Sequence, residues 1–551
     1  MHRRFLAWGG SLLAAILGAM ISPAAAPAKD WPMWGGTEAR NMAAEEKGLP
    51  ASFDPGQKQS GGNYDPTFAR NLKWAVRLGT ITCGTPIVSG GKVFVGTNNG
   101  RPRDPKCPGD YGILVCLDEA TGKFLWQLTV PAVPPSVGHM FYPQLGLCSS
   151  PTAEGNRLYL LTNRCEVVCL DAGGLADGNE GPFRDEGRYF APPASVNLGS
   201  AVVQEGNTYR LRPGKPVLAV KRAKRPLELG PADADVVWLY DMMNDLSIWP
   251  HDAAGSSVLV HGDLVFVTTS NGADWTHRNI PSPHAPVLAA LDKKAGTLVA
   301  TDDGTISTRI LEGSWSSPTL LKAGDRTLVI LGGPDGVCYA FDASSAKTAR
   351  EGRPGTLRKV WWCDCNLPAA RYRDRAAITF PSPTGPSEII ATPVFYKDRV
   401  YVSIGQDTRH GAAPGLLSCI DPSGTGDLTD KGRVWQYDRI SRTLSTVSIA
   451  DGLLYAADVA GTIHCLDADT GKRRWTFETG ELISGSTLVA DGKVYVGSEK
   501  GNLWVLAAGP ELRLLGKVPL GSAIYTTPVA ANGCLYVATC KHLFAFSQEA
   551  R

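Results

Sequence analysis

Two stretches near the middle of the chain carry side chains that could do chemistry. The first is Trp249-Pro250-His251-Asp252, and the second, SNGADWTHRNIPSPH, spans residues 270–284. Carboxylate, amide, imidazole and indole groups together suit stacking of a sugar or quinone, or the binding of a hard cation through oxygen ligands. The plainer alternative is that they hydrogen-bond within their own loops, because buried polar groups need partners in any case. The predicted ligand-binding residues are Trp249, His251, Asn271, Trp275, His277 and His284, and the candidates for a catalytic base are Asp252 and Asp274.

Three smaller groups of polar residues extend this set. Gln406, Asp407 and His410 form a second cluster of candidate ligand-binding residues, and Tyr142 with Gln144 forms a third. Asp177, Asn179 and Glu180 lie among glycines and offer oxygen atoms as calcium loops do, although their spacing differs from that of an EF-hand. They are metal candidates, and the alternative is an ordinary set of Asp/Gly turns.

The elements that must position these residues belong to an internal repeat. The stretch STVSIADGLLYAADVAGTIHCLDADTGKRRW, from Ser445 to Trp475, divides into four short apolar runs at Asp451-Gly452, Gly461 and Thr470-Gly471. Asp-Gly tolerates the positive φ of a tight hairpin, so the runs are predicted to be antiparallel strands. The pattern recurs eight times along the chain, at roughly the 40–50-residue period of propeller blades. The sequence therefore predicts an all-β, eight-bladed β-propeller of four-stranded antiparallel blades.

The ring is predicted to be closed by an N-terminal strand. The eighth copy supplies three strands, and an unmatched apolar run, Leu72 to Val76, precedes the first copy. Pairing that run with the last blade would complete it and protect the open sheet edges. Upstream of this run, Trp31 and Trp34 are expected either to plug or staple the ring, or to pack against the outer blades.

The repeat resembles a known family. The segments LVCLDEATGKFLW (Leu114 to Trp126) and IHCLDADTGKRRW (Ile463 to Trp475) resemble the repeat of pyrroloquinoline-quinone-type (PQQ-like) propellers. That family includes quinoprotein alcohol dehydrogenases and the BamB-type outer-membrane assembly lipoprotein. Through segments such as FYPQLGLCSSP and TSNGADWTHRNIPSP, the chain also resembles secreted PQQ-like repeat proteins of planctomycete-type bacteria.

The dehydrogenase branch implies a specific set of parts. The resemblance implies a PQQ cofactor polarised by Ca²⁺, an aspartate acting as base, and a disulfide between adjacent cysteines covering the cofactor. The sequence has neither an adjacent Cys-Cys pair nor a Cys-x-x-Cys-His haem site. If the chain is an enzyme of this kind, Asp252 or Asp274 is the expected base and Asn271 is expected near the ion.

The N-terminal sequence indicates export. Residues 1–28 have a basic start, an apolar run from Phe5 to Ile21 and small residues at Ala26 to Ala28, which is typical of a secretory signal peptide. We therefore expect a soluble periplasmic or extracellular monomer, with an N-terminal extension over 29–71 and the propeller over 72–549. The formal net charge of +2 gives no electrostatic basis for binding nucleic acid or an anionic membrane.

The positions of the long loops predict which face of the propeller carries the binding site. Loops between the second and third strands of a blade share a face, here the first face, with the connections between blades. Long insertions predicted on the first face span 97–112, 131–145, 241–252, 270–286, 369–388 and 405–415. The inserted region 171–236, with 343–358 and 421–432, is predicted on the opposite, second face. Long loops on a rigid framework usually carry binding, so the first face is the predicted site.

Three functions remain open at this stage. The first is a secreted, non-catalytic binding or scaffold protein for a protein, an envelope polymer or a small molecule. The second is a PQQ- and calcium-dependent quinoprotein dehydrogenase acting on alcohols or sugars, and the third is a BamB-like envelope assembly factor. We favour the first, because the repeats are strong and a recognisable catalytic set is missing from the sequence.

Overall fold

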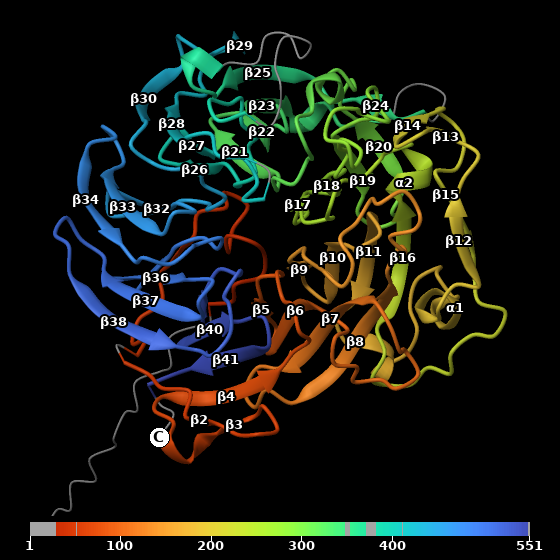
Figure 1. The fold of residues 1–551 in the computed structure, drawn as a ribbon, viewed down its shortest axis with the longest axis horizontal. Helices are drawn as coiled ribbons and strands as arrows, with labels where there is room; N and C mark the ends of the chain where they lie inside the picture. Colours follow the sequence, from red (N-terminus) through yellow and green to blue (C-terminus); the bar gives the residue numbers. More distant parts are fainter. Residues whose placement is uncertain (1–28, 51, 348–352, 371–381, 410, 549–551) are drawn as a thin grey trace, which may run out of the picture.

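Eight four-stranded antiparallel sheets form a closed ring of blades in the computed structural model, which describes residues 29–50, 52–347, 353–370, 382–409 and 411–548 (Figure 1). The predicted fold is therefore confirmed. The predicted signal peptide lies outside the described residues. No helix among these described ranges is long and apolar enough to cross a membrane.

From the innermost to the outermost strand, the first four blades are β5 (Ile87–Ser89), β6 (Lys92–Asn98), β7 (Tyr111–Asp118), β8 (Phe124–Pro131); β9 (Thr152–Glu154), β10 (Arg157–Leu161), β11 (Glu166–Asp171), β16 (Asp235–Asp241); β17 (Leu259–His261), β18 (Leu264–Thr268), β19 (Leu288–Asp292), β20 (Leu298–Thr301); and β21 (Thr319–Ala323), β22 (Arg326–Gly332), β23 (Val337–Asp342), β25 (Lys359–Asp364).

The last four blades are β26 (Val394–Tyr396), β27 (Arg399–Ile404), β28 (Leu416–Ile420), β30 (Arg433–Tyr437); β31 (Ser448–Ala450), β32 (Leu453–Ala457), β33 (Thr462–Asp467), β34 (Arg473–Glu478); β35 (Leu488–Ala490), β36 (Lys493–Gly497), β37 (Asn502–Ala507), β38 (Leu514–Pro519); and β39 (Val529–Ala531), β40 (Cys534–Ala538), β41 (His542–Phe546), β4 (Leu72–Arg77). The pairing of β4 with β41, with Ala75 opposite Phe544, confirms closure by the N-terminal strand.

Short elements decorate the ring. Three two-residue strands add to blades in parallel: β1 (Ala43–Ala44) on β35, β24 (Gly355–Thr356) on β20 and β29 (Gly426–Asp427) on β25. The remaining elements are the hairpin of β2 (Gln57–Lys58) and β3 (Tyr64–Asp65), the helices α1 (Glu186–Phe190) and α2 (Met242–Asp245), and the pairs β12 (Ser195–Leu198) with β15 (Leu218–Lys221) and β13 (Val202–Glu205) with β14 (Thr208–Leu211). Within the described ranges, the 3₁₀ turns are η1 (Pro66–Phe68), η2 (Gly174–Ala176), η3 (Ile306–Arg309), η4 (Ala343–Ser345) and η6 (Pro368–Ala370).

The tryptophan that follows Asp and Thr-Gly in the repeat joins neighbouring blades. Trp126 on β8 is buried and donates from Nε1 to the Ala172 carbonyl of the next blade at 3.1 Å. Trp74, Trp238, Trp435 and Trp475 make the same kind of bond to their next blades. Gly122, in the turn of the first blade, meets the ring of Trp74 from the last blade with a φ of +70°. At these five junctions the outer edge of the ring is thus held by an indole hydrogen bond, and Trp74 also lies against a glycine.

Substituting Gly122 with alanine tests this contact. A Cβ there would lie 2.7 Å from Trp74 Cδ2, so we expect the free energy of unfolding to fall by about 2–3 kcal/mol. The matched control is Gly155→Ala, which has a φ of +57° and open space around the new Cβ, and it should cost only about 1 kcal/mol. Urea unfolding of both variants measures the difference. Equal losses would show that the close contact with Trp74 adds nothing to the cost of the positive φ.

The N-terminal extension runs along the inner edges of the blades. Backbone atoms of Trp31 pair with Val88 of β5, and the carbonyls of Glu38 and Ala39 accept from Leu320 and Phe395 of the fourth and fifth blades. Other contacts reach the second blade from Pro32, the sixth from Asn41, the seventh from Met42 and the eighth from Glu46. Arg40 reaches the third blade through the Val258 carbonyl. One segment of chain therefore touches all eight blades, and it staples the ring from inside.

The inserted region 171–236 departs from its predicted place. It leaves from the second face after β11, as expected, but its β13–β14 hairpin reaches loops of the first face. The Tyr209 ring stacks on Trp249 at 4.6 Å, its backbone N–H donates to Asp274, and Leu211 N–H donates to the Pro281 carbonyl at 2.8 Å. The assignment of this whole region to the second face was wrong, because a long insertion can travel along the outer strand from its point of origin.

Candidate functional site

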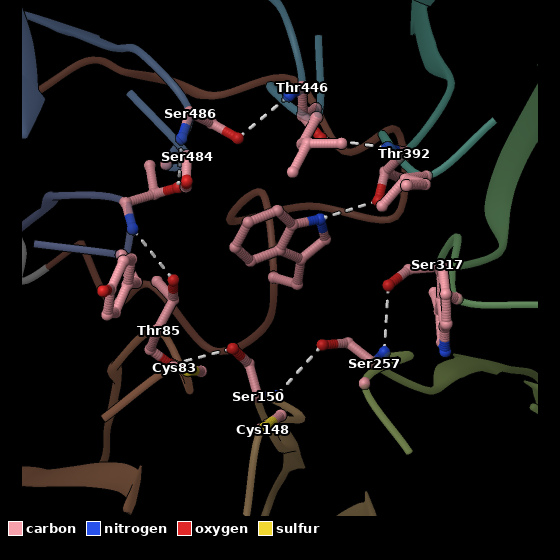
Figure 2. Close-up of a pocket in the computed structure, with 18 residues that line it drawn as sticks. Cys83, Thr85, Cys148, Ser150, Ser257, Ser317, Thr392, Thr446, Ser484 and Ser486 are labelled. Carbon is pink, nitrogen blue, oxygen red and sulfur yellow. Dashed lines mark hydrogen bonds between the residues drawn. The ribbon is translucent and has the colours of Figure 1, made fainter. Parts of the chain in front are cut away.

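A ring of hydroxyl side chains lines the central channel. Each blade contributes one serine or threonine just before its innermost strand: Thr85, Ser150, Ser257, Ser317, Thr392, Thr446, Ser486 and Thr527. A backbone N–H of one blade donates to the hydroxyl of the next, as from Ser150 to Ser257 at 3.1 Å and from Thr446 to Ser486 at 2.9 Å (Figure 2). The hydroxyls therefore serve first to join the blades at the channel wall.

Trp34 of the N-terminal extension enters the channel within this ring. Its Nε1 donates to the Thr392 hydroxyl at 3.0 Å, and its side chain lines the cavity of about 200 Å³ at the centre of the propeller. Toward the first face, a second layer of eight residues borders this cavity: Cys83, Cys148, Gly255, Trp315, Ile390, Leu444, Ser484 and Tyr525. The neighbouring Cys148 thiol and burial raise the pKa of Cys83 well above its usual range. Of the two alternatives for Trp34, plugging the ring is the one that the structure shows, and packing against the outer blades is not.

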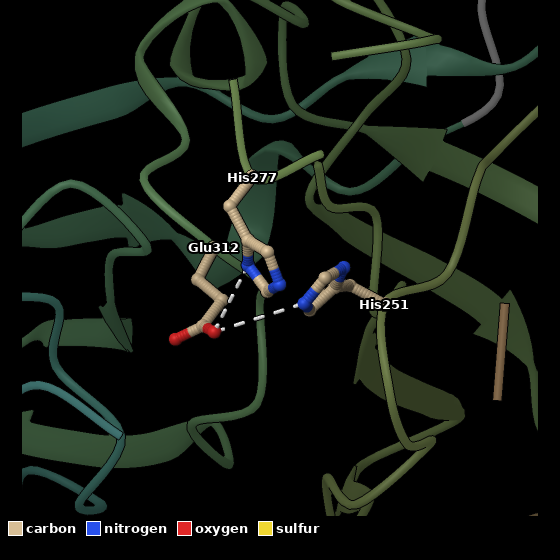
Figure 3. A group of neighbouring side chains, drawn as sticks. All are labelled: His251, His277 and Glu312. Atoms are coloured by element: carbon tan, nitrogen blue, oxygen red, sulfur yellow. Dashed lines mark ion pairs between the residues drawn. The ribbon is translucent and has the colours of Figure 1, made fainter. Parts of the chain in front are cut away.

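Two histidines and a glutamate meet at the first-face mouth of the channel. His251 Nε2 lies 3.7 Å from Glu312 Oε1, and His277 Nδ1 lies 3.4 Å from the same oxygen (Figure 3). His251 and Glu312 are buried, and the His277 side chain is 18% exposed. The three come from the connection before β17, the β18–β19 loop and the connection before β21. Three separate first-face loops therefore supply one compact group.

Local hydrogen bonds fix the orientation of these side chains. The Nδ1 of His251 lies 2.8 Å from the Ala273 carbonyl, so this nitrogen carries the proton and Nε2 faces Glu312. Trp315, which also borders the channel cavity, donates from Nε1 to the His251 carbonyl at 3.0 Å. The cluster is thus built onto the rim of the channel.

Charged groups surround the cluster. Asp252 Oδ1 lies 3.9 Å from His251 Nε2, and Asp252 Oδ2 lies 3.6 Å from an Arg409 nitrogen. The Arg409 guanidinium sits over the Tyr142 ring at 4.2 Å, which is a cation–π distance. Asp407 Oδ1 lies 3.4 Å from Arg409 Nε. The mouth therefore combines acidic, basic and aromatic groups within a small area.

The electrostatics of the mouth follow from burial and charge. Burial opposes ionisation of His251, but Glu312 and Asp252 outweigh it, so the pKa of His251 is raised. Burial raises the pKa of Glu388 well above its usual range, and the nearby Glu312 carboxylate adds to this shift. For Arg409, the effect of burial is outweighed by Asp407 and Asp252, and its pKa is raised. The mouth therefore favours a positive partner beside Glu312.

Several predicted residues order the loops around this cluster. Trp249 is fully buried, and Asn271 holds the loops by bonding Trp249 N–H, the Ser282 carbonyl and the Ser307 hydroxyl. Asp274 is buried and accepts from Thr276, Tyr209 and Asn279. Gln406 is buried and bonds four backbone groups of its own and a neighbouring loop. The polar side chains of Asn271, Asp274 and Gln406 thus hydrogen-bond within and between the loops, as the plainer alternative for these stretches expected.

The other predicted residues are more dispersed. Trp275 is 46% exposed and lies beside the rings of His139 and Tyr142, while His284 lies apart on the surface. Gln144 accepts through its carbonyl from Asn98. His410 lies outside the described residues. The calcium-loop candidates face arginines: Glu180 pairs with Arg157, and Asn179 accepts from Arg184, whereas Asp177 packs beside Gly173.

Sequence reasoning missed four residues of the mouth: Glu312, Trp315, Glu388 and Arg409. Glu312, Trp315 and Glu388 are single polar or aromatic residues in connections without a local motif, so the sequence carries no signal for them alone, whereas Arg409 lies beside the predicted Gln406 and Asp407. The hydroxyl ring did leave a signal, because a serine or threonine stands at one repeat position before every innermost strand, as in Thr85-Pro86, Thr392-Pro393 and Thr527-Pro528.

The sequence is similar to two kinds of known protein, BamB and quinohemoprotein alcohol dehydrogenases. Residues 69–178 and 415–510 match the family described as outer membrane protein assembly factor BamB. The BamB of Salmonella typhimurium is 35% identical over 95 residues, 15% of this chain and 24% of that protein. The quinohemoprotein alcohol dehydrogenase ADH IIB of Pseudomonas putida is 22% identical over 517 residues, 82% of this chain and 65% of that protein.

One solved structure shares the architecture of this chain. A europium-containing methanol dehydrogenase superposes with a TM-score of 0.54 at 12% identity, covering 94% of this chain and 98% of that chain. At this identity the likeness shows the fold alone. The matched part spans about a quarter of the BamB relative and about two thirds of the alcohol dehydrogenase.

Proposed function

The chain is a PQQ-like repeat β-propeller related to BamB and to quinohemoprotein alcohol dehydrogenases, and we propose that it is an exported, non-catalytic binding protein working through the first-face mouth of its channel. Export is proposed because residues 1–28 have the basic start, apolar run and small residues typical of a signal peptide. The observation that carries the binding proposal is the occupation of the channel by the protein's own Trp34.

The channel does not fit the quinone cofactor that the dehydrogenase relatives suggest. PQQ is a flat tricyclic molecule with three carboxylates, so it needs a broad slot with cationic partners. The remaining cavity is about 200 Å³, and none of the described residues lining it is a lysine, arginine, aspartate or glutamate. The described walls of this cavity therefore offer neither charge partners for the cofactor nor carboxylates for a calcium ion, whereas Glu312, Asp252 and Arg409 lie at the mouth.

The mouth itself is suited to recognition. Trp275 presents an exposed ring next to His139 and Tyr142, and Arg409 covers the other side of this group. Exposed aromatic rings beside a guanidinium stack well on sugar rings and on planar or cationic side chains. An envelope polymer, a protein segment or a small molecule would each find apolar and hydrogen-bonding contacts here.

A quinoprotein dehydrogenase remains the second candidate, because the match to the alcohol dehydrogenase runs over 82% of this chain. Calorimetric titration of the purified protein with PQQ, with and without Ca²⁺, separates the two functions. We expect no binding in either titration, and no oxidation of ethanol or glucose with an artificial electron acceptor. Tight, calcium-dependent PQQ binding with turnover would overturn the binding proposal and establish the dehydrogenase.

Trp34→Ala is the informative companion variant in that titration. If the absence of charged groups excludes the cofactor, the variant will also fail to bind PQQ. If PQQ binds the variant and not the native protein, the indole of Trp34 is the barrier, and the channel has kept a cofactor site beneath it.

A further inference from the structure

The spacing of three ligand atoms at the channel mouth matches a metal coordination sphere. His251 Nε2, His277 Nδ1 and a Glu312 carboxylate oxygen all lie within 4.8 Å of one another. Two of these separations are 3.7 and 3.4 Å. With zinc–ligand bonds of about 2.0–2.1 Å, neighbouring atoms of a tetrahedron lie about 3.4 Å apart. Two of the three separations therefore already approach those of a zinc site, and the third lies within 4.8 Å.

His251 is already arranged as a ligand. It is 1% exposed, its Nδ1–H donates to the Ala273 carbonyl at 2.8 Å, and its Nε2 has no hydrogen-bond partner among the described residues. A protonated Nδ1 leaves the lone pair on Nε2, which points at Glu312. Metal-bound histidines commonly have this arrangement, with the distal nitrogen donating to a carbonyl or carboxylate. A proton or a metal ion can satisfy this nitrogen, and the carboxylates of Glu312 and Asp252 beside it favour either cation.

The ligand types select the class of ion. Calcium takes six to eight oxygen ligands, whereas two imidazoles with one carboxylate suit zinc and its neighbours among the divalent transition metals. We propose that His251, His277 and Glu312 form a binding site for one such ion, with zinc as the best match. This site lies apart from the oxygen-rich loop of Asp177 to Glu180 and uses a glutamate that sequence reasoning did not identify.

The position of the site suggests how the ion serves the proposed function. Three protein ligands occupy three positions of a tetrahedron, and the fourth in such sites takes water or a donor atom of a ligand. The His277 side chain is 18% exposed, and Trp275 with its exposed ring lies two residues earlier. A bound zinc would hold a carboxylate or nitrogen donor of the partner beside that ring. This role rests on the proposed function, whereas metal binding itself does not.

The test is a calorimetric titration of the purified, chelator-treated full chain with ZnCl₂, and separately with CaCl₂. We expect one zinc per chain and no calcium binding at the same concentrations. His277→Gln should weaken zinc binding by about 100-fold or more. His284→Gln, a surface histidine of the same loop, is the matched control and should bind as the native protein does. Zinc should also raise the melting temperature of the native protein more than that of His277→Gln.

Two further measurements make the outcome decisive. Cobalt(II) in place of zinc should give the intense visible absorption of a four-coordinate ion, and His277→Gln and Glu312→Gln should each abolish it. Thirteen cysteines offer competing ligands, so zinc binding that both variants retain while melting normally would place the ion elsewhere and overturn the proposal. Failure to bind zinc, or binding of calcium instead, would also overturn it. PQQ binding would overturn the proposed function alone, so the two failures are distinguishable.

Discussion

Replacing Arg40 with alanine is expected to lower the free energy of unfolding by about 3–5 kcal/mol. The Arg40 side chain is fully buried and makes three hydrogen bonds to carbonyls: Nε to Pro318 at 3.0 Å, one terminal nitrogen to Trp34 at 2.7 Å and the other to Val258 at 2.8 Å. Burial lowers the pKa of Arg40 to about 9, against the nearby charge of Glu38, so the group stays charged at neutral pH. Truncation leaves three carbonyls without this donor and opens a cavity.

The same substitution should release the N-terminal extension from the channel. Arg40 joins that segment to the third and fourth blades. Trp34, whose indole enters the channel, precedes Arg40 in the same segment. Urea unfolding measures the stability loss. Limited thermolysin digestion with mass spectrometry should show cleavage within residues 29–44 of the variant and not of the native protein. Arg210→Ala, whose side chain is 69% exposed, should change stability by less than about 0.5 kcal/mol. An Arg40 variant that resists digestion and unfolds like this control would show that the segment is held by its backbone bonds alone.

The fold could be predicted from the sequence because the same local pattern of strands and turns recurs along the chain. Gly122, Gly296 and Gly471 each adopt a positive φ and lie against Trp74, Trp238 and Trp435 of the preceding blade. Apolar strands, Asp-Gly hairpins and a glycine beneath a tryptophan all agree on one structure, and such consistency across levels specifies a fold. The missing outer strand of the last blade could likewise be identified as Leu72 to Val76, since a closed ring has to be completed by some strand.

Only part of the candidate site could be predicted from the sequence, because its residues come from different loops. His251, Asp252 and His277 stood in dense polar stretches and were predicted as a group. Glu312 completes the cluster from a connection that shows no motif, and Arg409 reaches Asp252 from the fifth blade. Which polar side chains converge depends on the path of each loop over the ring, and loop paths have no periodicity that a sequence displays. Asn271 and Asp274 illustrate the converse, since both lie in the predicted stretch and order its backbone.

Trp34 links the fold to the question of function. A tryptophan in an N-terminal extension has no partner that sequence can name, so packing on the outer blades was the favoured interpretation and plugging of the channel the alternative. In the structure it donates to Thr392 inside the hydroxyl ring, where the dehydrogenase interpretation requires room for a cofactor. Because one fold hosts many activities, the content of the channel bears on function more directly than the repeat does.

Truncating Trp126 to alanine is expected to cost about 3–5 kcal/mol, the usual loss for a large aromatic side chain in a core. The side chain is 1% exposed, packs against Phe94 at a ring separation of 5.9 Å and donates from Nε1 to Ala172 across the first interface between blades. A Cβ on Gly174 would lie 2.8 Å from the Trp126 ring, so the second blade is shaped around this indole. The loss therefore combines burial, an inter-blade hydrogen bond and a cavity that a rigid closed ring cannot easily collapse.

Trp126→Phe divides this loss into its parts. Phenylalanine keeps most of the aromatic contact but leaves the Ala172 carbonyl without its donor, so a loss of about 1–2 kcal/mol is expected. Trp275→Ala removes an exposed tryptophan and should change stability by less than about 0.5 kcal/mol. Denaturant unfolding of the three variants, with unchanged slopes, checks the order. If Trp126→Ala lost no more than Trp275→Ala, the blades would be held by their strands and hydroxyl ring, and the repeated tryptophan would need another explanation.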